Sequence, residues 1–274
     1  MTDRSSWSTA VGDVGHGVIT VRGYALVDLI RNLPYSSVVY LTLRGELPTA
    51  SQARVMDAAL CGIIEHGFYA PSSVASRLIA SASPESVMPA VAGSLLTVGS
   101  ITVSPQHSAE LMYRAKSLVA DGMSWDEATD QIVDDIVAAR RRMPGVGHPL
   151  HPDGDPRAIA LREVAVANGV WGDASSAYES MVLKYCARTG RKLPVNIDGM
   201  LGCVLTELGF TPLQMPGIAA ISFMPGLIAH AVEEIEQGLK LRVVEGDYTG
   251  PQPRPLPVDL PYRLADAEAE ANGH

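Results

Sequence analysis

The run of residues 144–157 constrains this chain more than any other stretch. It contains four prolines and three glycines, so neither a helix nor a strand can continue through it. The backbone must follow a tight path there, and that path carries two histidines and one arginine. His148 titrates near neutrality when unperturbed and could move a proton, whereas Arg157 could hold a carboxylate through two hydrogen bonds. The competing interpretation is a proline-rich surface loop.

The composition predicts a globular chain with a large core. The 274 residues are 47% apolar and 19% charged, which excludes a disordered chain and allows one large domain or two small ones. The formal charge of −9 argues against non-specific binding to nucleic acid or to an anionic membrane. The three cysteines lie far apart among apolar neighbours, and we expect them to be core thiols in a reducing compartment: Cys61, Cys186 and Cys203.

The N-terminal residues contain no apolar signal segment. We also expect no membrane-spanning helix, because no window approaches the roughly 18 uncharged apolar residues that such a helix needs. These observations predict a soluble cytoplasmic protein.

Apolar residues recur at helical spacing through most of the chain, which predicts an all-α fold. Thr49 with Gln52, and Ser124 with Glu127, form capping-box patterns that mark two helix starts. The helix at 86–98 is expected to break at Gly93. The expected helices cover residues 24–33, 36–43, 49–67, 71–82, 86–98, 106–121, 124–142, 158–168, 174–188, a buried helix that carries Leu201, Leu205 and Leu208, and 216–237.

Two segments depart from the helical pattern. Residues 8–24 mix β-formers with glycines, which predicts a short hairpin or arm. Residues 243–274 hold many prolines and end acidic, so we expect an extended, partner-dependent tail. A smaller substructure is expected near residues 124–200.

Asp198, just before an apolar helix, allows two interpretations. An aspartate in this position is commonly an ordinary N-cap. Alternatively, it is a general base in an apolar pocket, where desolvation raises its basicity. For His66 the ordinary interpretation is a capping or core histidine, and for His230 a histidine that packs between helices.

Four groups of segments occur in an order that matches one enzyme family. In this combination they resemble the citrate synthase superfamily, and in particular its short citryl-CoA lyase-like branch. The segments are Arg22-Gly23-Tyr24 with residues 33–48, Gly147-His148 with residues 154–157, residues 195–199 with 208–210, and residues 248–251.

The resemblance implies a citrate synthase-like, all-α architecture. A large helical domain (residues 1–123 and 201–274) would hold a smaller inserted helical domain (residues 124–200). The resemblance also implies a homodimer or higher homo-oligomer. The substrates would be a coenzyme A thioester and a keto or hydroxy acid, and no metal would be needed.

The same resemblance assigns roles to individual residues. Asp198 matches the base that removes the α-proton of an acyl-CoA, and His148 matches the histidine that protonates the keto oxygen in condensation or takes the hydroxyl proton in cleavage. Arg157 and His66 would bind the acid, and Arg242 would reach across a dimer interface to complete the partner's site. The coenzyme A-binding turn would consist of Pro144, Gly145, Val146, Gly147 and His151.

Two positions depart from the family pattern. Thr102 stands where synthases carry the histidine that polarises the thioester carbonyl, and His107 could take that role if the link at 99–106 is looped differently. Lyase-type members also lack this histidine. Phe223 stands where the family usually has an arginine facing a second carboxylate. Losing such charged hydrogen bonds, worth about 1.5–3 kcal/mol, predicts a less acidic partner than a citrate-sized tricarboxylate provides.

We therefore expect a citryl-CoA lyase-like enzyme that makes or cleaves the carbon–carbon bond of a 3-hydroxyacyl-CoA. One alternative is a citrate or 2-methylcitrate synthase-type acyltransferase, which also hydrolyses the thioester. Another is a non-catalytic scaffold that binds coenzyme A. The presence of both His148 and Asp198 favours an enzyme over a scaffold.

Overall fold

The computed structural model describes residues 7–99, 101–238 and 240–257. The chain divides after Arg242 into two compact units, each of which is described by itself. In the second unit, residues 243–257 carry no helix or strand, as expected for an extended tail; the remainder of that predicted tail, 258–274, lies outside the described residues. The predicted partition into residues 1–123, 124–200 and 201–274 stays a prediction.

Helices make up most of the described chain, which confirms the predicted all-α fold class. Three short strands, β1 (Gly12–Gly15), β2 (Val18–Val21) and β3 (Tyr24–Ala25), form an antiparallel sheet in that order and confirm the hairpin predicted at 8–24. The helices are α1 (Leu26–Asn32), α2 (Tyr35–Arg44), α3 (Ala50–Cys61), the 3-10 helix η1 (Gly67–Tyr69), α4 (Pro71–Ala82), α5 (Met88–Leu95), α6 (Pro105–Ala120), α7 (Trp125–Ala138), α8 (Pro156–Ala167), α9 (Asp173–Thr189), α10 (Ile197–Glu207) and α11 (Met215–Glu236).

Two helices begin at the predicted capping boxes. At α3, Thr49 Oγ1 accepts from the backbone of Gln52 at 3.2 Å, and Gln52 Oε1 accepts from the backbone of Thr49 at 2.9 Å. Ser124 and Glu127 make the same pair of bonds at the start of α7, at 3.2 and 2.9 Å. Each box satisfies two backbone N–H groups near the helix start, one of them on the cap residue itself.

The predicted helix at 49–67 is too long at its C-terminal end. α3 stops at Cys61, because Glu65 is held by contacts that a helix would not allow. Its carboxylate accepts from the backbone N–H of His66 at 2.8 Å and lies 3.1 Å from Nε2 of His230 in α11. His66 therefore lies in a loop that leads into η1 instead of at a helix end.

Three further sequence-based expectations are wrong. α5 runs through Gly93 without a break, because the missing Cβ lets α5 approach Ile79 of α4; a Cβ would lie 2.4 Å from Ile79 Cδ1. α7 ends at Ala138, before the arginines, and Arg140 takes a left-handed φ of 53°. Cys61 is exposed at the end of α3, so it is not a core thiol, whereas Cys203 is buried and Cys186 partly buried.

α10 forms the centre of the core. Every residue from Gly199 to Thr206 is buried, and the helix packs against α3, α6, α8 and α9. Gly202 permits the close approach of α6, since a Cβ there would lie 2.0 Å from Ser108 Oγ. The preceding residue at the start of this helix, Asp198, is only partly buried. The carboxylate of Asp198 therefore lies at the edge of the core.

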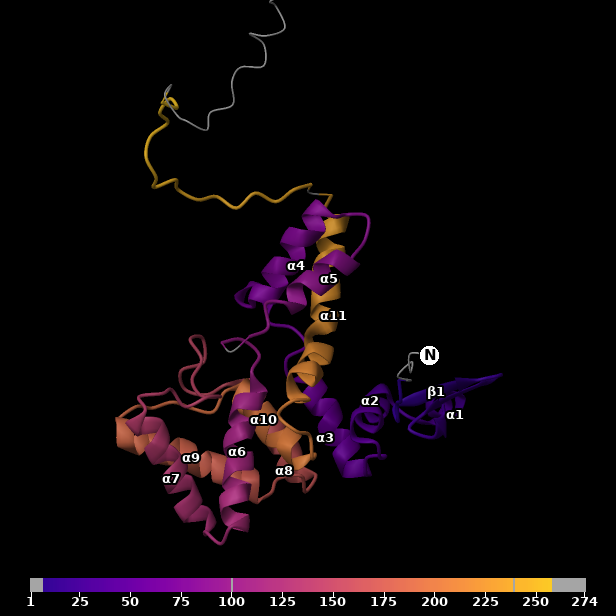
Figure 1. Cartoon of the computed structure of the whole chain (residues 1–274), viewed down its shortest axis with the longest axis vertical. Helices are drawn as coiled ribbons and strands as arrows, with labels where there is room; N and C mark the ends of the chain where they lie inside the picture. The colour runs from indigo at the N-terminus through magenta and orange to yellow at the C-terminus, as the bar shows by residue number, and fades with distance from the viewer. Residues whose placement is uncertain (1–6, 100, 239, 258–274) are drawn as a thin grey trace, which may run out of the picture. The chain divides into compact units, whose positions relative to one another are not determined.

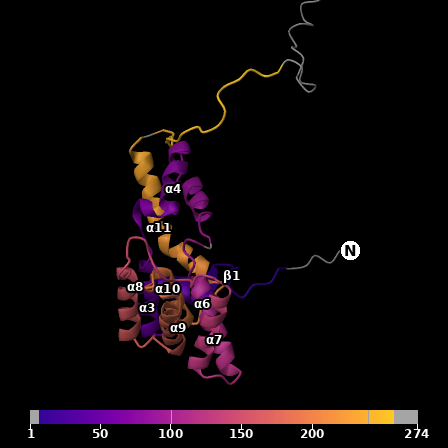
Figure 2. The same cartoon turned by 90° about the vertical axis from the view of Figure 1, so that its left-hand side faces the viewer.

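α11 links two groups of helices within the first unit. It packs against α4 and α5 over one part of its length and contacts α3 and α6 over another (Figures 1 and 2). The premise that no window is apolar enough to span a membrane is wrong, because α11 has 22 residues and an 18-residue window of mean hydropathy 1.5, of which 44% is buried. Since a buried core helix meets the same criteria, and α11 packs against four other helices, we interpret α11 as a core helix.

The end of α11 is fastened by a buried ion cluster. The Glu234 side chain is fully buried and accepts from Arg77 Nε at 2.7 Å and from Arg242 Nε. Arg77 also donates to Gln237 Oε1 at 2.9 Å and contacts Glu233. Burial alone would raise the pKa of Glu234, but the hydrogen bonds from Arg242 and Arg77 lower it below the usual value.

We predict that Glu234→Ala lowers the free energy of unfolding by about 3 kcal/mol, because it leaves the buried Arg77 without its main partner. Urea unfolding followed by circular dichroism measures this change. The matched control is Glu233→Ala, whose side chain is 58% exposed; it should cost less than about 1 kcal/mol. Since the folded-state pKa of Glu234 is lowered, its stabilisation is present above the unfolded pKa and fades as the pH falls through the folded value. Equal losses in both variants would contradict this account of the cluster.

Candidate active site

A short backbone pairing joins the proline- and glycine-rich turn to the segment before α10. Val146 and Val195 form an antiparallel bridge. Gly147 N donates to the carbonyl of Pro194 at 2.7 Å, and Asn196 N donates to the carbonyl of Gly145 at 3.0 Å. Asn196 Nδ2 adds a bond of 2.8 Å to the carbonyl of Gly147. This pairing brings His148 and Asp198, which are far apart in sequence, to one place.

Glycines make that pairing possible. Gly145 has a φ of +73°, and a Cβ on it would lie 2.5 Å from the Cα of Gly199. A Cβ on Gly199 would in turn lie 2.3 Å from the carbonyl oxygen of Gly145. The fully buried Tyr178 packs next to this contact and donates its hydroxyl to the carbonyl of Pro144 at 2.6 Å. The two backbones therefore touch directly.

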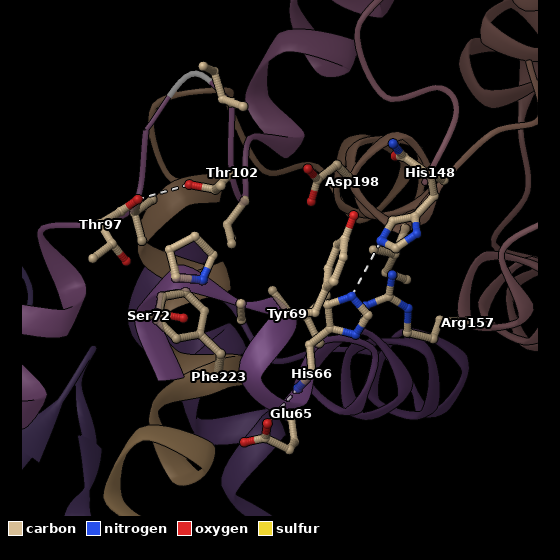
Figure 3. Close-up of a pocket in the computed structure, with 18 of the residues that line it drawn as sticks. Glu65, His66, Tyr69, Ser72, Thr97, Thr102, His148, Arg157, Asp198 and Phe223 are labelled. Carbon is tan, nitrogen blue, oxygen red and sulfur yellow. Dashed lines mark hydrogen bonds between the residues drawn. The ribbon is translucent and has the colours of Figure 1, made fainter. Parts of the chain in front are cut away.

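Both segments open onto a cavity of about 460 Å³ (Figure 3). Residues from the loop before η1, from the link after α5, from the turn at 147–149, from α8, from the start of α10 and from α11 all contribute to its wall. The lining residues are Ile63, Ile64, Glu65, His66, Tyr69, Ala70, Pro71, Ser72, Thr97, Val98, Ile101, Thr102, Val103, Gly147, His148, Pro149, Arg157, Asn196, Ile197, Asp198 and Phe223.

Two histidines face each other in this wall. The Nε2 atoms of His66 and His148 lie 3.3 Å apart. The outer nitrogens meet donors, because Leu150 N donates to His148 Nδ1 at 3.2 Å and Arg157 Nη1 lies 3.4 Å from His66 Nδ1. A neutral imidazole carries one proton, and the bond from Leu150 places that of His148 on Nε2, from which it can donate to His66 Nε2. A ligand oxygen that enters between the rings would take the place of this contact and could accept from His148 Nε2, and also from His66 when its proton is on Nε2.

The surroundings keep both rings neutral. Burial is the largest cause that lowers the pKa of His66, followed by the positive charge of Arg157. Burial also lowers the pKa of His148, together with the charges of His151 and Arg157. The His151 ring stacks on that of His148, with centroids 4.7 Å apart. At neutral pH each ring can consequently donate one hydrogen bond without carrying a positive charge.

Arg157 is held by an aspartate that the sequence reasoning missed. Asp155 is buried and accepts from Arg157 Nε at 3.0 Å and from Arg157 Nη2 at 2.8 Å. It also accepts from the backbone N–H of Ile197 at 3.0 Å. Burial alone would raise the pKa of Asp155, but hydrogen bonds and the charge of Arg157 lower it. One ionised carboxylate thus orients the arginine and the start of α10 together.

Asp198 is not the N-cap of α10. Asn196 caps this helix by accepting from the backbone N–H of Gly199 at 3.1 Å, which leaves the Asp198 carboxylate free to point into the cavity (Figure 3). Burial raises the pKa of Asp198 above its usual value, against the lowering effects of a backbone hydrogen bond from Ser104 and the charge of Arg157. A carboxyl group with a raised pKa can both take and return a proton.

The structure brings together some of the predicted site residues and leaves others outside. His66, His148, Arg157, Asp198, Phe223, Gly147 and Thr102 line the cavity. His107 does not line it, although its charge reaches Asp198 and lowers that pKa slightly. The lining also lacks Pro144, Gly145, Val146 and His151, and Arg242 is bound to Glu234 at the end of α11.

Two cavity residues carried no signal in the sequence. Tyr69, in η1, has its ring centroid 5.6 Å from that of His66 and 5.5 Å from that of His148, and its hydroxyl points toward the space between His148 and Asp198 (Figure 3). The second is Glu65, the residue before His66. Hydrogen-bond partners would have been needed to single them out, and a sequence does not contain those. Among the described residues, no group of three His, Cys, Asp or Glu side chains could hold a metal.

The fold and this site define the class of protein. The family "Citrate synthase, C-terminal domain" matches residues 49–243, which is more than half of the chain. The chain therefore belongs to the citrate synthase family, and the resemblance noted in the sequence is confirmed.

The curated relatives that match the chain include citrate synthases and a 2-methylcitrate synthase. Citrate synthase 2 of Bacillus subtilis is 26% identical over 77% of this chain and 54% of its own length. The 2-methylcitrate synthase of Shewanella oneidensis is 28% identical over 71% of this chain and 52% of its own length. The chain thus spans about half the length of the curated relatives it matches.

Solved structures match the chain over more of its length. The citryl-CoA lyase of Hydrogenobacter thermophilus superposes with a TM-score of 0.82 at 32% identity, covering 92% of this chain and 97% of that chain. The ATP citrate lyase of Methanothrix soehngenii superposes with a TM-score of 0.72 at 20% identity, covering 92% of this chain and 43% of that chain. At that lower identity the likeness concerns the fold alone.

We predict that Arg157→Gln raises the pKa of both His66 and His148. Removing a nearby positive charge lowers the free energy of each protonated ring relative to the neutral ring. Titration of the imidazole C–H resonances by nuclear magnetic resonance measures both values. The control is Arg162→Gln, since Arg162 binds Glu179 at 2.7 Å and lies over Trp171. If the pKa values of the two histidines stay unchanged or fall in Arg157→Gln, the proposed electrostatic coupling between Arg157 and the histidines is excluded.

Proposed function

We propose that this chain is an enzyme that makes or cleaves the carbon–carbon bond of a 3-hydroxyacyl-CoA. The observation that carries the proposal is the meeting of Asp198 and the His66–His148 pair in one cavity, beside an arginine (Figure 3). A carboxyl group, two converging donors and a carboxylate-binding cation are the groups that this chemistry needs. The likeness to the citryl-CoA lyase of Hydrogenobacter thermophilus over most of both chains supports the lyase direction.

In the condensation direction, Asp198 removes the α-proton of the acyl-CoA to give an enolate. The keto acid binds with a carboxylate on Arg157 and its keto oxygen between the two Nε2–H groups, which stabilise the negative charge that develops there. The keto oxygen takes the place of the direct contact between the two Nε2 atoms, which lie 3.3 Å apart.

In the cleavage direction, His148 takes the hydroxyl proton of the bound thioester. Its own proton must first shift from Nε2 to Nδ1, which breaks the hydrogen bond from Leu150. Losing one such bond costs about 0.5–1.5 kcal/mol, a small part of the contribution expected from catalysis. The carbon–carbon bond then breaks, and Asp198 in its protonated form returns a proton to the enolate. The raised pKa of Asp198 favours that protonated form.

A synthase-type reaction, in which thioester hydrolysis follows condensation, is the second candidate. The curated relatives named citrate synthase and 2-methylcitrate synthase favour it. Thr102 lines the cavity but donates its hydroxyl to the carbonyl of Thr97 at 2.8 Å, so it is not free to polarise a thioester. This contact supports the lyase over the synthase.

We predict that Asp198→Asn reduces exchange of the α-protons of acetyl-CoA with deuterated solvent by about 10²-fold or more, because an amide cannot act as the base. Mass spectrometry of the recovered thioester measures the exchange. The variant should bind coenzyme A as the parent does. Asp153→Asn, on the exposed part of the turn that carries His148, is the control and should exchange normally. Equal exchange in the Asp198 variant and the parent would remove Asp198 from the mechanism.

We also propose a cytoplasmic homodimer or higher homo-oligomer, in which residues 243–274 contact a neighbouring subunit. Four exposed apolar side chains in the described part of this segment support such a contact: Val243, Val244, Tyr248 and Leu256. Arg242, at the end of the first unit, would then sit close to a subunit boundary.

Deleting residues 243–274 should therefore weaken the oligomer and the activity together, since the described part of the segment, residues 243–257, forms no helix or strand. Sedimentation velocity and initial rates, measured at the same protein concentration, test this prediction. The control is the full-length chain with the substitution Lys240→Ala, which keeps these four apolar side chains. A truncated chain that stays fully active as a monomer would contradict the proposal.

A further inference from the structure

The two ends of the cavity differ in chemistry. One end is formed by His66, His148 and Arg157. Across the cavity lie Phe223 and the link that contains Thr97 and Thr102 (Figure 3). Phe223 is only 6% exposed in α11, and the other side chains of the link that line the cavity are apolar: Val98, Ile101 and Val103. A ligand that fills the cavity therefore meets a polar end and an apolar end.

The polar end can hold one carboxylate. Among the described residues that line the cavity, Arg157 is the only lysine or arginine. Its Nε and Nη2 atoms are already bound to both oxygens of Asp155. The Nη1 edge, next to His66, remains for a ligand.

Among the described lining residues, the apolar end offers no cation to a second carboxylate, and its one unengaged side-chain donor is the Ser72 hydroxyl next to Phe223 (Figure 3). The Thr97 hydroxyl donates to the carbonyl of Ser94 and the Thr102 hydroxyl to the carbonyl of Thr97, each at 2.8 Å. Phe223 has no polar atom in its side chain. A carboxylate buried there without a cationic partner would be strongly disfavoured.

A negative charge also lies near Phe223 on the same face of α11. Residues 223 and 226 are three positions apart and so are neighbours on the helix surface. The carboxylate of Glu65 lies against Gly226, where a Cβ would be 2.4 Å from Glu65 Oε2. Although burial opposes it, hydrogen bonds from His230, Gly67 and His66 lower the pKa of Glu65 and keep it ionised. A second carboxylate would thus meet repulsion and no cation to offset it.

We propose that the acid partner in this reaction is a 2-oxo monocarboxylic acid whose side chain is apolar and lies against Phe223. This inference rests on the proposed function and names its substrate class. The corresponding thioester is a 3-carboxy-3-hydroxyacyl-CoA with an alkyl group on C3. On cleavage the hydroxyl proton passes to His148, the C2–C3 bond breaks toward the thioester enolate, and Asp198 protonates C2. The products are the 2-oxo acid and the acyl-CoA, and no oxidant or further reactant is required.

The test compares acids with the purified full chain. Condensation of acetyl-CoA with 2-oxobutyrate, 2-oxohexanoate and oxaloacetate is followed by mass spectrometry of the thioester products. We expect kcat/KM for 2-oxobutyrate to exceed that for oxaloacetate by about tenfold or more, as a buried charge without a partner predicts. Equal or better use of oxaloacetate would overturn the inference while leaving the proposed function in place. No condensation product with any of the three acids, together with no α-proton exchange in acetyl-CoA, would overturn both.

Two variants of Phe223 test the location of the side chain. Phe223→Ala enlarges the apolar end, so the ratio of kcat/KM for 2-oxohexanoate to that for 2-oxobutyrate should rise about tenfold. Phe223→Arg places a cation there, so preference should shift toward oxaloacetate by about tenfold. Ile228→Ala, on the same helix but outside the cavity lining, is the control and should keep the parent's ratios. If Phe223→Ala folds and leaves both ratios unchanged, the acid side chain does not lie against Phe223 and the inference fails.

Discussion

The candidate site depends on one direct contact between two backbones. Residues 145–147 pair with residues 194–196 through the Val146–Val195 bridge and the hydrogen bonds around it. This contact needs glycine at both 145 and 199, because a Cβ on either would collide with the other chain segment. The pairing sets the distance between a turn that carries His148 and a helix that begins with Asp198. Without it, the two groups would belong to separate parts of the molecule.

The carboxylates of Asp155 and Glu65 then orient the side chains that the backbone contact brings together. Asp155 accepts from Arg157 and from the backbone of Ile197, so one carboxylate fixes both the carboxylate-binding cation and the start of α10. On the other side, Glu65 anchors the loop of His66 to α11 through His230. These contacts place the Nε2 atoms of two neutral imidazoles 3.3 Å apart, and they leave a carboxyl group of raised pKa beside them. The result is a site that can move protons at neutral pH.

Much of the fold could be predicted from local signals in the sequence. The capping boxes at Thr49 and Ser124 marked helix starts, because their hydrogen bonds join residues only three positions apart. The pairing of His148 with Asp198 in one site came from the family resemblance, and the structure places both in the same cavity. Signals that depend on distant partners failed. The end of α3 was misplaced because Glu65 is drawn toward α11, and Asp198 resembled an N-cap because the true cap, Asn196, stands two residues earlier. Asp155 was missed as a site residue because its importance comes from Arg157 and Ile197 folding onto it.

The central claim is that one cavity holds the keto oxygen between two histidines and the thioester carbon next to Asp198. A crystal structure of the chain with 2-oxobutyrate and an unreactive acetyl-CoA analogue tests it most directly. The account predicts the keto oxygen within hydrogen-bond distance of Nε2 of both His66 and His148, the carboxylate on Arg157, and the α-carbon of the thioester analogue beside the Asp198 carboxylate. An acid bound with its carboxylate against Phe223, or a thioester bound away from Asp198, would contradict it.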